Sequence, residues 1–287
     1  MLATVIQLII NGLLLGGIYA LISIGLTLIF GVLEIINFAH GEFLMLGMYA
    51  SYWLFQLFGV DPYLSLLMVI PTFFLVGLAV QRIIIQPIIN APPLNQIFAT
   101  VGLSLVLQNV ALFFWKADYR TVRTAYSTLC LKTGGLMISL PRLVAFVLAI
   151  AMISALLMFL KRTYTGKAIR ALAQEKRAAM LMGINVYRMY QIAFGIGIAC
   201  VGAAGAILIP IYYAFPTVGA LFVLIAFVVV ILGGYNSLVG ALIGGLIIGL
   251  VEAFSGFFLS PHLKEAVYFV IFILILLFRP TGLFGRG

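Results

Sequence analysis

The chain has 287 residues, of which 65% are hydrophobic and only 8% are charged, and its mean hydropathy is +1.27. Soluble globular proteins carry roughly a quarter charged residues, so this composition excludes a water-soluble domain. A net charge of +9 would suit nucleic acid, but seven of the sixteen basic residues lie between Lys161 and Arg188. A basic segment between apolar runs is typical of a loop beside a membrane, so we expect no nucleic-acid partner.

Nine apolar runs follow one another along the chain, and crossing the hydrocarbon as a helix takes about 20 apolar residues. None alternates apolar and polar residues as barrel strands do. We therefore predict a single all-α polytopic membrane domain over residues 1–287, with eight or nine transmembrane helices and room for a broken or re-entrant segment. The runs lie at about 4–31, 35–58, 62–86, 97–115, 142–160, 189–213, 217–233, 237–259 and 265–279.

The first run has no basic leader and no A-x-A-like cleavage site, so we interpret it as a retained span. Cytoplasmic loops are enriched in Lys and Arg. This bias places the 161–188 loop and the C-terminus in the cytoplasm. The N-terminus is then outside if all nine runs cross.

Residues 36–42, INFAHGE, place Asn37, His40 and Glu42 between two apolar runs. An ionisable side chain inside a membrane is costly and is therefore a functional candidate. In a continuous helix Asn37 and Gly41 would share a face, whereas a broken helix would use such polar groups to satisfy its freed backbone. We predict that this stretch belongs to a substrate pathway or gate. The alternative is that its side chains join helices or lie at the membrane interface.

A polar stripe follows on the run at 97–115. Thr100, Ser104 and Gln108 recur every four residues and so share one helix face. They are candidates for lining a passage. Hydrogen bonds within the helix or between helices are the competing interpretation.

Small residues at helical spacing predict close helix packing, as in Gly12-x-x-x-Gly16, Gly240-x-x-x-Gly244 and Gly245-x-x-x-Gly249. Glu252 lies on the same face as the last pair. A carboxylate there must meet a partner or water, so we predict a structural or gating role for it.

The 161–188 loop contains a predicted helix that starts near Gly166, capped by Thr165, and stops at Gly183. Its many alanines would let it seat in a groove of another protein, although a basic amphipathic helix can also lie on lipid. Its Thr-Gly-Lys sequence lacks the other residues of a phosphate-binding loop. The chain is therefore not expected to use ATP itself, and transport energy must come from an ion gradient or a separate subunit.

Metal and disulfide chemistry find little support in the sequence. Two histidines and two cysteines do not form a usual structural zinc set, and the zinc deaminase signature that His-Gly-Glu would begin is incomplete. Cys130 and Cys200 lie far apart, with Cys200 in an apolar run. We expect no metal, no cofactor and no disulfide.

Three stretches together resemble the branched-chain amino acid permeases of ATP-binding-cassette importers. They are GGIYALISIGLTLIFGVLEIINFAHGEFLMLGMYASY, QPIINAPPLNQIFATVGLSLVLQNVALFFW, and TGKAIRALAQEKRAAMLMGINVYR followed by ILGGYNSLVGALIGGLIIGLVE. The second is most similar to the first of the two paired permeases, the high-affinity H-type subunit. The resemblance covers nearly the whole chain.

The resemblance implies a multi-pass permease of the bacterial inner membrane that translocates branched-chain or related hydrophobic amino acids. The partners it implies are a second homologous permease, two cytoplasmic ATP-binding subunits that use the ATP, and a periplasmic solute-binding protein. It also implies that the 161–188 loop is the coupling segment that docks on the ATPase. The coupling residues would be Gly166, Ala171, Glu175, Ala178, Ala179 and Gly183.

Other functions stay open on the sequence alone. Urea and short-chain amide permeases share the N-x-AHGE stretch. A stand-alone ion-coupled transporter would use His40 and Glu42 as proton groups. A membrane enzyme would use the same pair as acid and base, but it lacks a nucleophile or metal set, so we do not expect an enzyme.

Overall fold

The fold is built almost entirely of helices that correspond to the apolar runs. The structure is a computed structural model that describes residues 2–133, 135–260, 263–279 and 281–284. The helices are α1 (Leu2–Leu33), α2 (His40–Phe58), α3 (Leu66–Val80), the π-helical turn η1 (Gln81–Ile85), α4 (Gln86–Ile88), α5 (Pro93–Trp115), α6 (Leu140–Arg162), α7 (Tyr164–Gln174), α8 (Lys176–Leu181), α9 (Val186–Leu208), α10 (Val218–Gly233), α11 (Leu238–Phe258) and α12 (Lys264–Phe278).

Six of the helical segments in the described chain are long and apolar enough to cross a membrane. Two further apolar helices, Val218–Gly233 and Ala266–Phe278, are shorter. The chain is therefore a polytopic helical membrane protein, as predicted. The six long segments are Leu2–Leu33, Leu66–Ile88, Pro93–Trp115, Leu140–Arg162, Val186–Leu208 and Leu238–Phe258.

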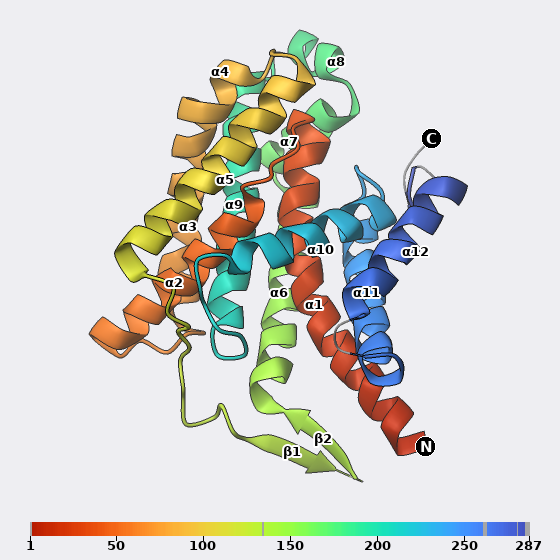
Figure 1. Cartoon of the computed structure of the whole chain (residues 1–287). Coiled ribbons are helices and arrows are strands. Elements are labelled where there is room, and N and C mark those ends of the chain that lie inside the picture. The colour runs from red at the N-terminus through yellow and green to blue at the C-terminus, as the bar shows by residue number, and fades with distance from the viewer. Residues whose placement is uncertain (1, 134, 261–262, 280, 285–287) are drawn as a thin grey trace.

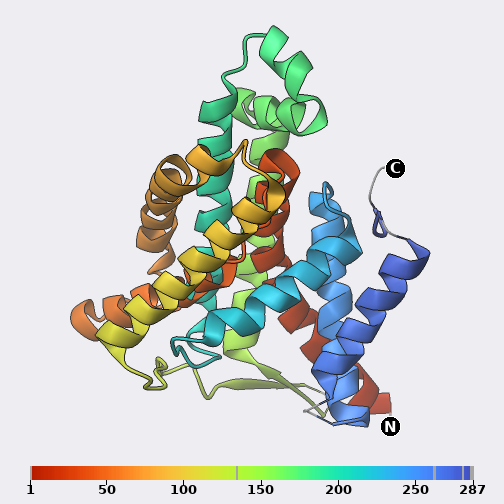
Figure 2. The same cartoon turned by 45° about the horizontal axis from the view of Figure 1, so that its top comes forward.

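Most of the helices run between two ends of the molecule, whereas α10 lies across its middle (Figure 1). One end carries α4, α7, α8 and the C-terminal part of α12, and we call it the α7–α8 end. The opposite end carries the N-terminus and a β-hairpin, and we call it the hairpin end. Turning the molecule shows α1 and α9 inside the bundle and α5 along its outside (Figure 2).

Small residues bring α1 and α11 into backbone contact. A Cβ atom on Gly16 would lie 2.8 Å from the Gly245 carbonyl oxygen, and one on Gly12 would lie 2.8 Å from Cα of Leu250. Gly249 packs in turn on Gly12 and Gly16. These contacts confirm the close packing predicted from the glycine spacing, and they make α1 part of the inner frame.

The hairpin departs from the all-α prediction. Strands β1 (Cys130–Thr133) and β2 (Leu136–Ser139) pair antiparallel around Gly135, whose φ of +83° suits a glycine. The Gln7 amide on α1 holds this hairpin, because it donates to the Met137 carbonyl at 2.7 Å and accepts from the Met137 N–H at 2.8 Å. Such short strands give too few residues for an apolar periodicity to be visible in sequence.

A second set of polar contacts ties the loops of the hairpin end together. The Tyr126 hydroxyl donates to Asp61 at 2.6 Å, and the other oxygen of Asp61 accepts from the Tyr63 N–H at 2.9 Å. Burial and the hydrogen bond to Asp61 raise the pKa of Tyr126, so this phenol remains a donor at neutral pH.

At the α7–α8 end, the C-terminal segment pairs with the end of α10. The Leu283 N–H donates to the Leu232 carbonyl at 2.9 Å, and the Phe284 N–H donates to the Gly233 carbonyl at 3.2 Å. The last carbonyls of a helix have no partner inside it, so these two bonds satisfy groups that α10 leaves open.

Cys130 and Cys200 are both free, which agrees with the expectation that they form no disulfide. Cys130 is exposed on β1, whereas Cys200 is buried within α9.

Candidate functional site

The INFAHGE stretch, residues 36–42, lies at a break between two helices. Helix α1 ends at Leu33, and Glu34 takes the left-handed conformation with φ of +59°, which is uncommon for a residue other than glycine. Residues 34–37 are neither helix nor strand, and α2 starts only at His40. The predicted broken segment is therefore present. A continuous helix through Asn37 and Gly41 is not, so their shared helix face does not exist.

Asn37 and His40 are fully buried at this break. The His40 Nε2 atom lies 3.0 Å from the Ile22 carbonyl oxygen in the middle of α1. A carbonyl oxygen only accepts, so Nε2 carries the proton, and in the neutral ring Nδ1 is left as an acceptor. The Asn37 side-chain oxygen accepts from the Ala39 N–H at 3.2 Å. Within the described residues, Asn37 Nδ2 and His40 Nδ1 have no hydrogen-bond partner.

Glu42 connects this break to α5. Its Oε1 atom accepts from Gln108 Nε2 at 2.8 Å and from the Ser104 hydroxyl at 3.2 Å. The third residue of the stripe, Thr100, donates to the Ile36 carbonyl at 3.0 Å. The polar stripe therefore faces the INFAHGE stretch, and its hydrogen bonds join α5 to the break and to α2, besides one from Thr100 to Ile97 within α5.

Six predicted site residues are thus brought together by three segments: the break, the first turn of α2 and the inner face of α5. They are Asn37, His40, Glu42, Thr100, Ser104 and Gln108.

Two helix N-termini meet at Glu42. The carboxylate belongs to the first turn of α2, and the start of α10 packs on the same turn. A Cβ atom on Gly219 would lie 2.8 Å from Glu42 Oε2, and one on Gly41 would collide with the Gly219 carbonyl oxygen. Helix N-termini carry partial positive charge, so both favour a negative Glu42. Gly41 is required here because the two backbones touch.

The part played by α10 was not predicted from the sequence. Its first turn contains no ionisable residue, and its contribution is a backbone dipole and a glycine contact. The glycine at 219 was the one available signal, and it was one of 29 in the chain.

Comparison with known proteins assigns the chain to a family. A sequence model described as "Branched-chain amino acid transport system / permease component" matches residues 8–276. The chain belongs to this permease family.

The alignments with its relatives cover nearly the whole of this chain. The BraD high-affinity branched-chain amino acid transport system permease protein of Pseudomonas aeruginosa is 32% identical over 98% of this chain and 96% of its own. The LivH permease protein of Escherichia coli is 33% identical, over 96% of this chain and 94% of its own. A probable LivH of Methanocaldococcus jannaschii is 29% identical, over 92% and 88% respectively.

In this permease Glu252 lies in a separate network and does not join the six residues around the break. It is buried on α11, where one oxygen accepts from the Tyr19 hydroxyl at 2.5 Å and the other pairs with Lys264 Nζ at 2.6 Å. The expectation that this carboxylate needs a partner is confirmed. Tyr19 and Lys264 were missed, because no spacing rule relates residues on α1 and α12 to one on α11.

The predicted coupling segment at 161–188 differs from the single helix that was expected there. Its N-cap is Thr163, whose hydroxyl accepts from the Gly166 N–H at 3.0 Å, and the predicted cap Thr165 is wrong. The chain breaks at Glu175 into α7 and α8, because the Glu175 carboxylate caps α8 by accepting from the Arg177 N–H at 3.2 Å. Gly183 follows with φ of +78°, which agrees with its predicted role as a helix stop.

The predicted coupling residues fall into two groups. Gly166 and Ala179 are buried inside the permease, and a Cβ atom at 166 would collide with the end of α6. Glu175, Ala178 and Gly183 are exposed, and Ala171 is half-buried. Around the exposed group, large apolar side chains face outward: Met180, Leu181 and Met182 are 56%, 88% and 81% exposed.

Proposed function

We propose that this protein is the membrane subunit of an ATP-driven importer that moves branched-chain amino acids across the bacterial inner membrane. Its partners would be a second homologous permease, two cytoplasmic ATP-binding subunits that consume the ATP, and a periplasmic solute-binding protein. The family and the printed names of its relatives support the substrate class. The sequence lacks a phosphate-binding loop, so the energy of ATP hydrolysis would reach this chain through its contact with the ATP-binding subunits.

The chain would cross the membrane nine times. The broken segment with α2 makes one crossing, and α10 and α12 make two more beside the six long segments. The opposite positions of the two ends in Figure 1 support this count, with the α7–α8 end in the cytoplasm. In a Cys130→Ser background, which removes the exposed native thiol, a cysteine at Met182, which is 81% exposed, should then react only with reagents that reach the cytoplasm. Labelling of intact cells by an impermeant maleimide would contradict this topology.

The break at 34–39 with Glu42 would act as the pathway or gate. The observation that carries this proposal is that three buried polar atoms at this one place have no partner among the described residues: Asn37 Nδ2, His40 Nδ1 and Glu42 Oε2. Buried polar groups are normally satisfied, and exceptions mark functional or hydrated sites. The atoms offer a donor and two acceptors where α2 and α10 both begin. A polar substrate group or water at this point would form hydrogen bonds with these atoms without breaking existing ones.

The proposal is tested with the complete importer in proteoliposomes. Glu42→Gln keeps the shape and an acceptor oxygen but replaces the carboxyl group beside the two helix N-termini with an amide. We expect normal membrane levels and an uptake of labelled leucine lowered at least about tenfold, the equivalent of 1.4 kcal/mol. His40→Ala should likewise insert normally and lower uptake. Parent-like uptake by both variants would remove the role given to this site.

The exposed side of α7 and α8 would dock on the ATP-binding subunit. Ala178 and Ala179 make a matched pair, because Ala178 is exposed and the neighbouring Ala179 is buried. Ala178→Trp adds bulk on the exposed side and should abolish ATPase recruitment while thermal stability is kept. Ala179→Trp should instead destabilise the permease itself, by about 1–3 kcal/mol through overpacking. Retention of both recruitment and uptake by Ala178→Trp would place the docking surface elsewhere.

A further inference from the structure

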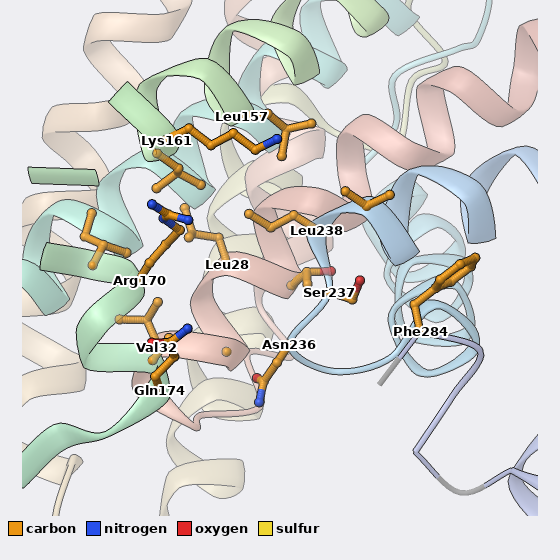
Figure 3. A pocket seen from close by; sticks show the side chains of 16 residues that line it. Leu28, Val32, Leu157, Lys161, Arg170, Gln174, Asn236, Ser237, Leu238 and Phe284 are labelled. Atoms are coloured by element: carbon orange, nitrogen blue, oxygen red, sulfur yellow. The ribbon is translucent and has the colours of Figure 1, made fainter. Parts of the chain in front are cut away.

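A cavity of about 560 Å³ opens at the α7–α8 end, beside the last turns of α1 that precede the break at 34–39. Its volume lies in the range of small-molecule binding sites. The wall is built from segments distant in sequence: the second half of α1, the last turn of α6, α7, the start of α11 and Phe284. Figure 3 shows Lys161 and Arg170 on one side and Ser237 and Phe284 on the other.

The charge on this wall is entirely positive. Lys161 ends α6 and Arg170 lies on α7, and both line the cavity. The lining residues of the described chain include no Asp or Glu, and neither cation forms an ion pair with a described residue. Two like charges facing one space repel each other, and an anion between them would remove that repulsion.

Hydrogen-bond donors complete the wall. The side-chain amides of Gln174 and Asn236 and the hydroxyl of Ser237 line the cavity. Leu238 and Val239 begin α11, whose dipole favours an anion. The Ser237 hydroxyl caps this turn by accepting from the Gly240 N–H at 3.0 Å, which leaves the hydroxyl proton able to donate. A phosphate group, with several acceptor oxygens and an affinity for the planar arginine fork, matches this set of donors.

We propose that this cavity binds a phosphate-bearing anion, supplied by a lipid headgroup or by a phosphate compound in solution. The occupant would bridge α7 to the start of α11 and so would fix the coupling segment against the membrane helices. This binding site goes beyond the transport function proposed above and does not depend on it, because it rests on the cavity and its charges alone.

Hydrogen–deuterium exchange of the full chain in lipid nanodiscs tests the proposal and separates the two sources. In neutral phosphatidylcholine discs, added inorganic phosphate should slow exchange at residues 164–174 and 236–241 if the source is soluble. Discs containing phosphatidylglycerol, without added phosphate, should slow it at the same residues if the source is lipid. No change in either experiment would overturn the proposal.

Variants decide whether the two cations carry the effect. Arg170→Gln should lower the affinity for the protecting anion by about tenfold, as expected for the loss of one charge-assisted hydrogen bond. Lys161→Gln combined with Arg170→Gln should abolish protection, and each single variant checks that a loss does not reflect misfolding. Lys167→Gln is the matched control, because Lys167 is exposed on α7 and does not line the cavity. Equal losses in Lys167→Gln, or protection by leucine but not by phosphate, would refute an anion site.

Discussion

Helices α1 and α5 are both apolar and long enough to span a membrane, yet they are attached to the protein in different ways. In α1, 83% of the most apolar stretch is buried, whereas in α5 only 11% is. Glycines bring α1 into backbone contact with α11, while α5 meets the break and α2 through three polar side chains. Close backbone packing dominates the attachment of α1, whereas hydrogen bonds make up much of the attachment of α5.

This difference separates the frame of the permease from the part that is able to rearrange. Backbone contacts between small residues have one fitting geometry, because any shift causes a clash. Hydrogen bonds to Glu42 can be exchanged for bonds to water or to a passing ligand at little net cost. We therefore expect α1 and α11 to move together and α5 to move relative to them.

The largest effect is expected from breaking the frame. A Cβ atom at Gly245 would lie 2.5 Å from the Ala20 nitrogen and 2.6 Å from its Cα, so Gly245→Leu forces α1 and α11 apart. We expect a loss of about 3 kcal/mol in the free energy of unfolding, measured by denaturant titration in detergent. The matched control is Gly102→Leu on α5, where an added Cβ meets no atom within 4 Å. Equal stabilities of the two variants would refute the distinction between the helices.

A smaller effect is expected from detaching α5. Gln108→Leu removes the 2.8 Å hydrogen bond to the Glu42 carboxylate and should cost about 2 kcal/mol. Asn109→Leu is the control, because the Asn109 amide is exposed and bonds only to Leu105 of its own helix. It should change stability by less than about 0.5 kcal/mol. Hydrogen exchange of α5 is the direct measurement, and faster exchange should appear in Gln108→Leu alone.

The smallest effect is expected at the other polar tie between α5 and the break. Thr100→Val keeps the side-chain shape and removes the bond to the Ile36 carbonyl, at a cost of about 1 kcal/mol. Thr100 also bonds to Ile97 within its own helix, so its loss should loosen residues 34–39 without releasing α5. Unchanged exchange at 34–39 would show that the break is held by packing.

Much of the architecture could be predicted because each apolar run is long enough to demand a membrane environment. The glycine spacing also predicted close helix packing, although it did not indicate that α1 and α11 are the helices that meet. The hairpin at 130–139 and the break at Glu175 could not be predicted in this way. Both depend on local hydrogen bonds, to Gln7 in one case and to the Arg177 N–H in the other, which leave no periodicity in the sequence.

The parts of the candidate site that contain ionisable or polar residues in an apolar chain were predicted from the sequence. The parts made by common residue types were missed. A histidine and a glutamate in an apolar chain stand out, and the four-residue spacing placed Thr100, Ser104 and Gln108 on one face. The start of α10 and the Tyr19 hydroxyl beside Glu252 belong to common residue types. Their importance comes from tertiary contacts that one sequence does not display.

The pairing of Leu283 and Phe284 with the last carbonyls of α10 has a consequence for biogenesis. The donors that complete α10 emerge from the ribosome only after α11 and α12 have been made. Until then the last carbonyl groups of α10 lack these partners, so the α7–α8 end of the newborn chain is incomplete throughout synthesis. A stop codon after Arg279 would leave it so permanently, and a quality-control protease would meet that end first.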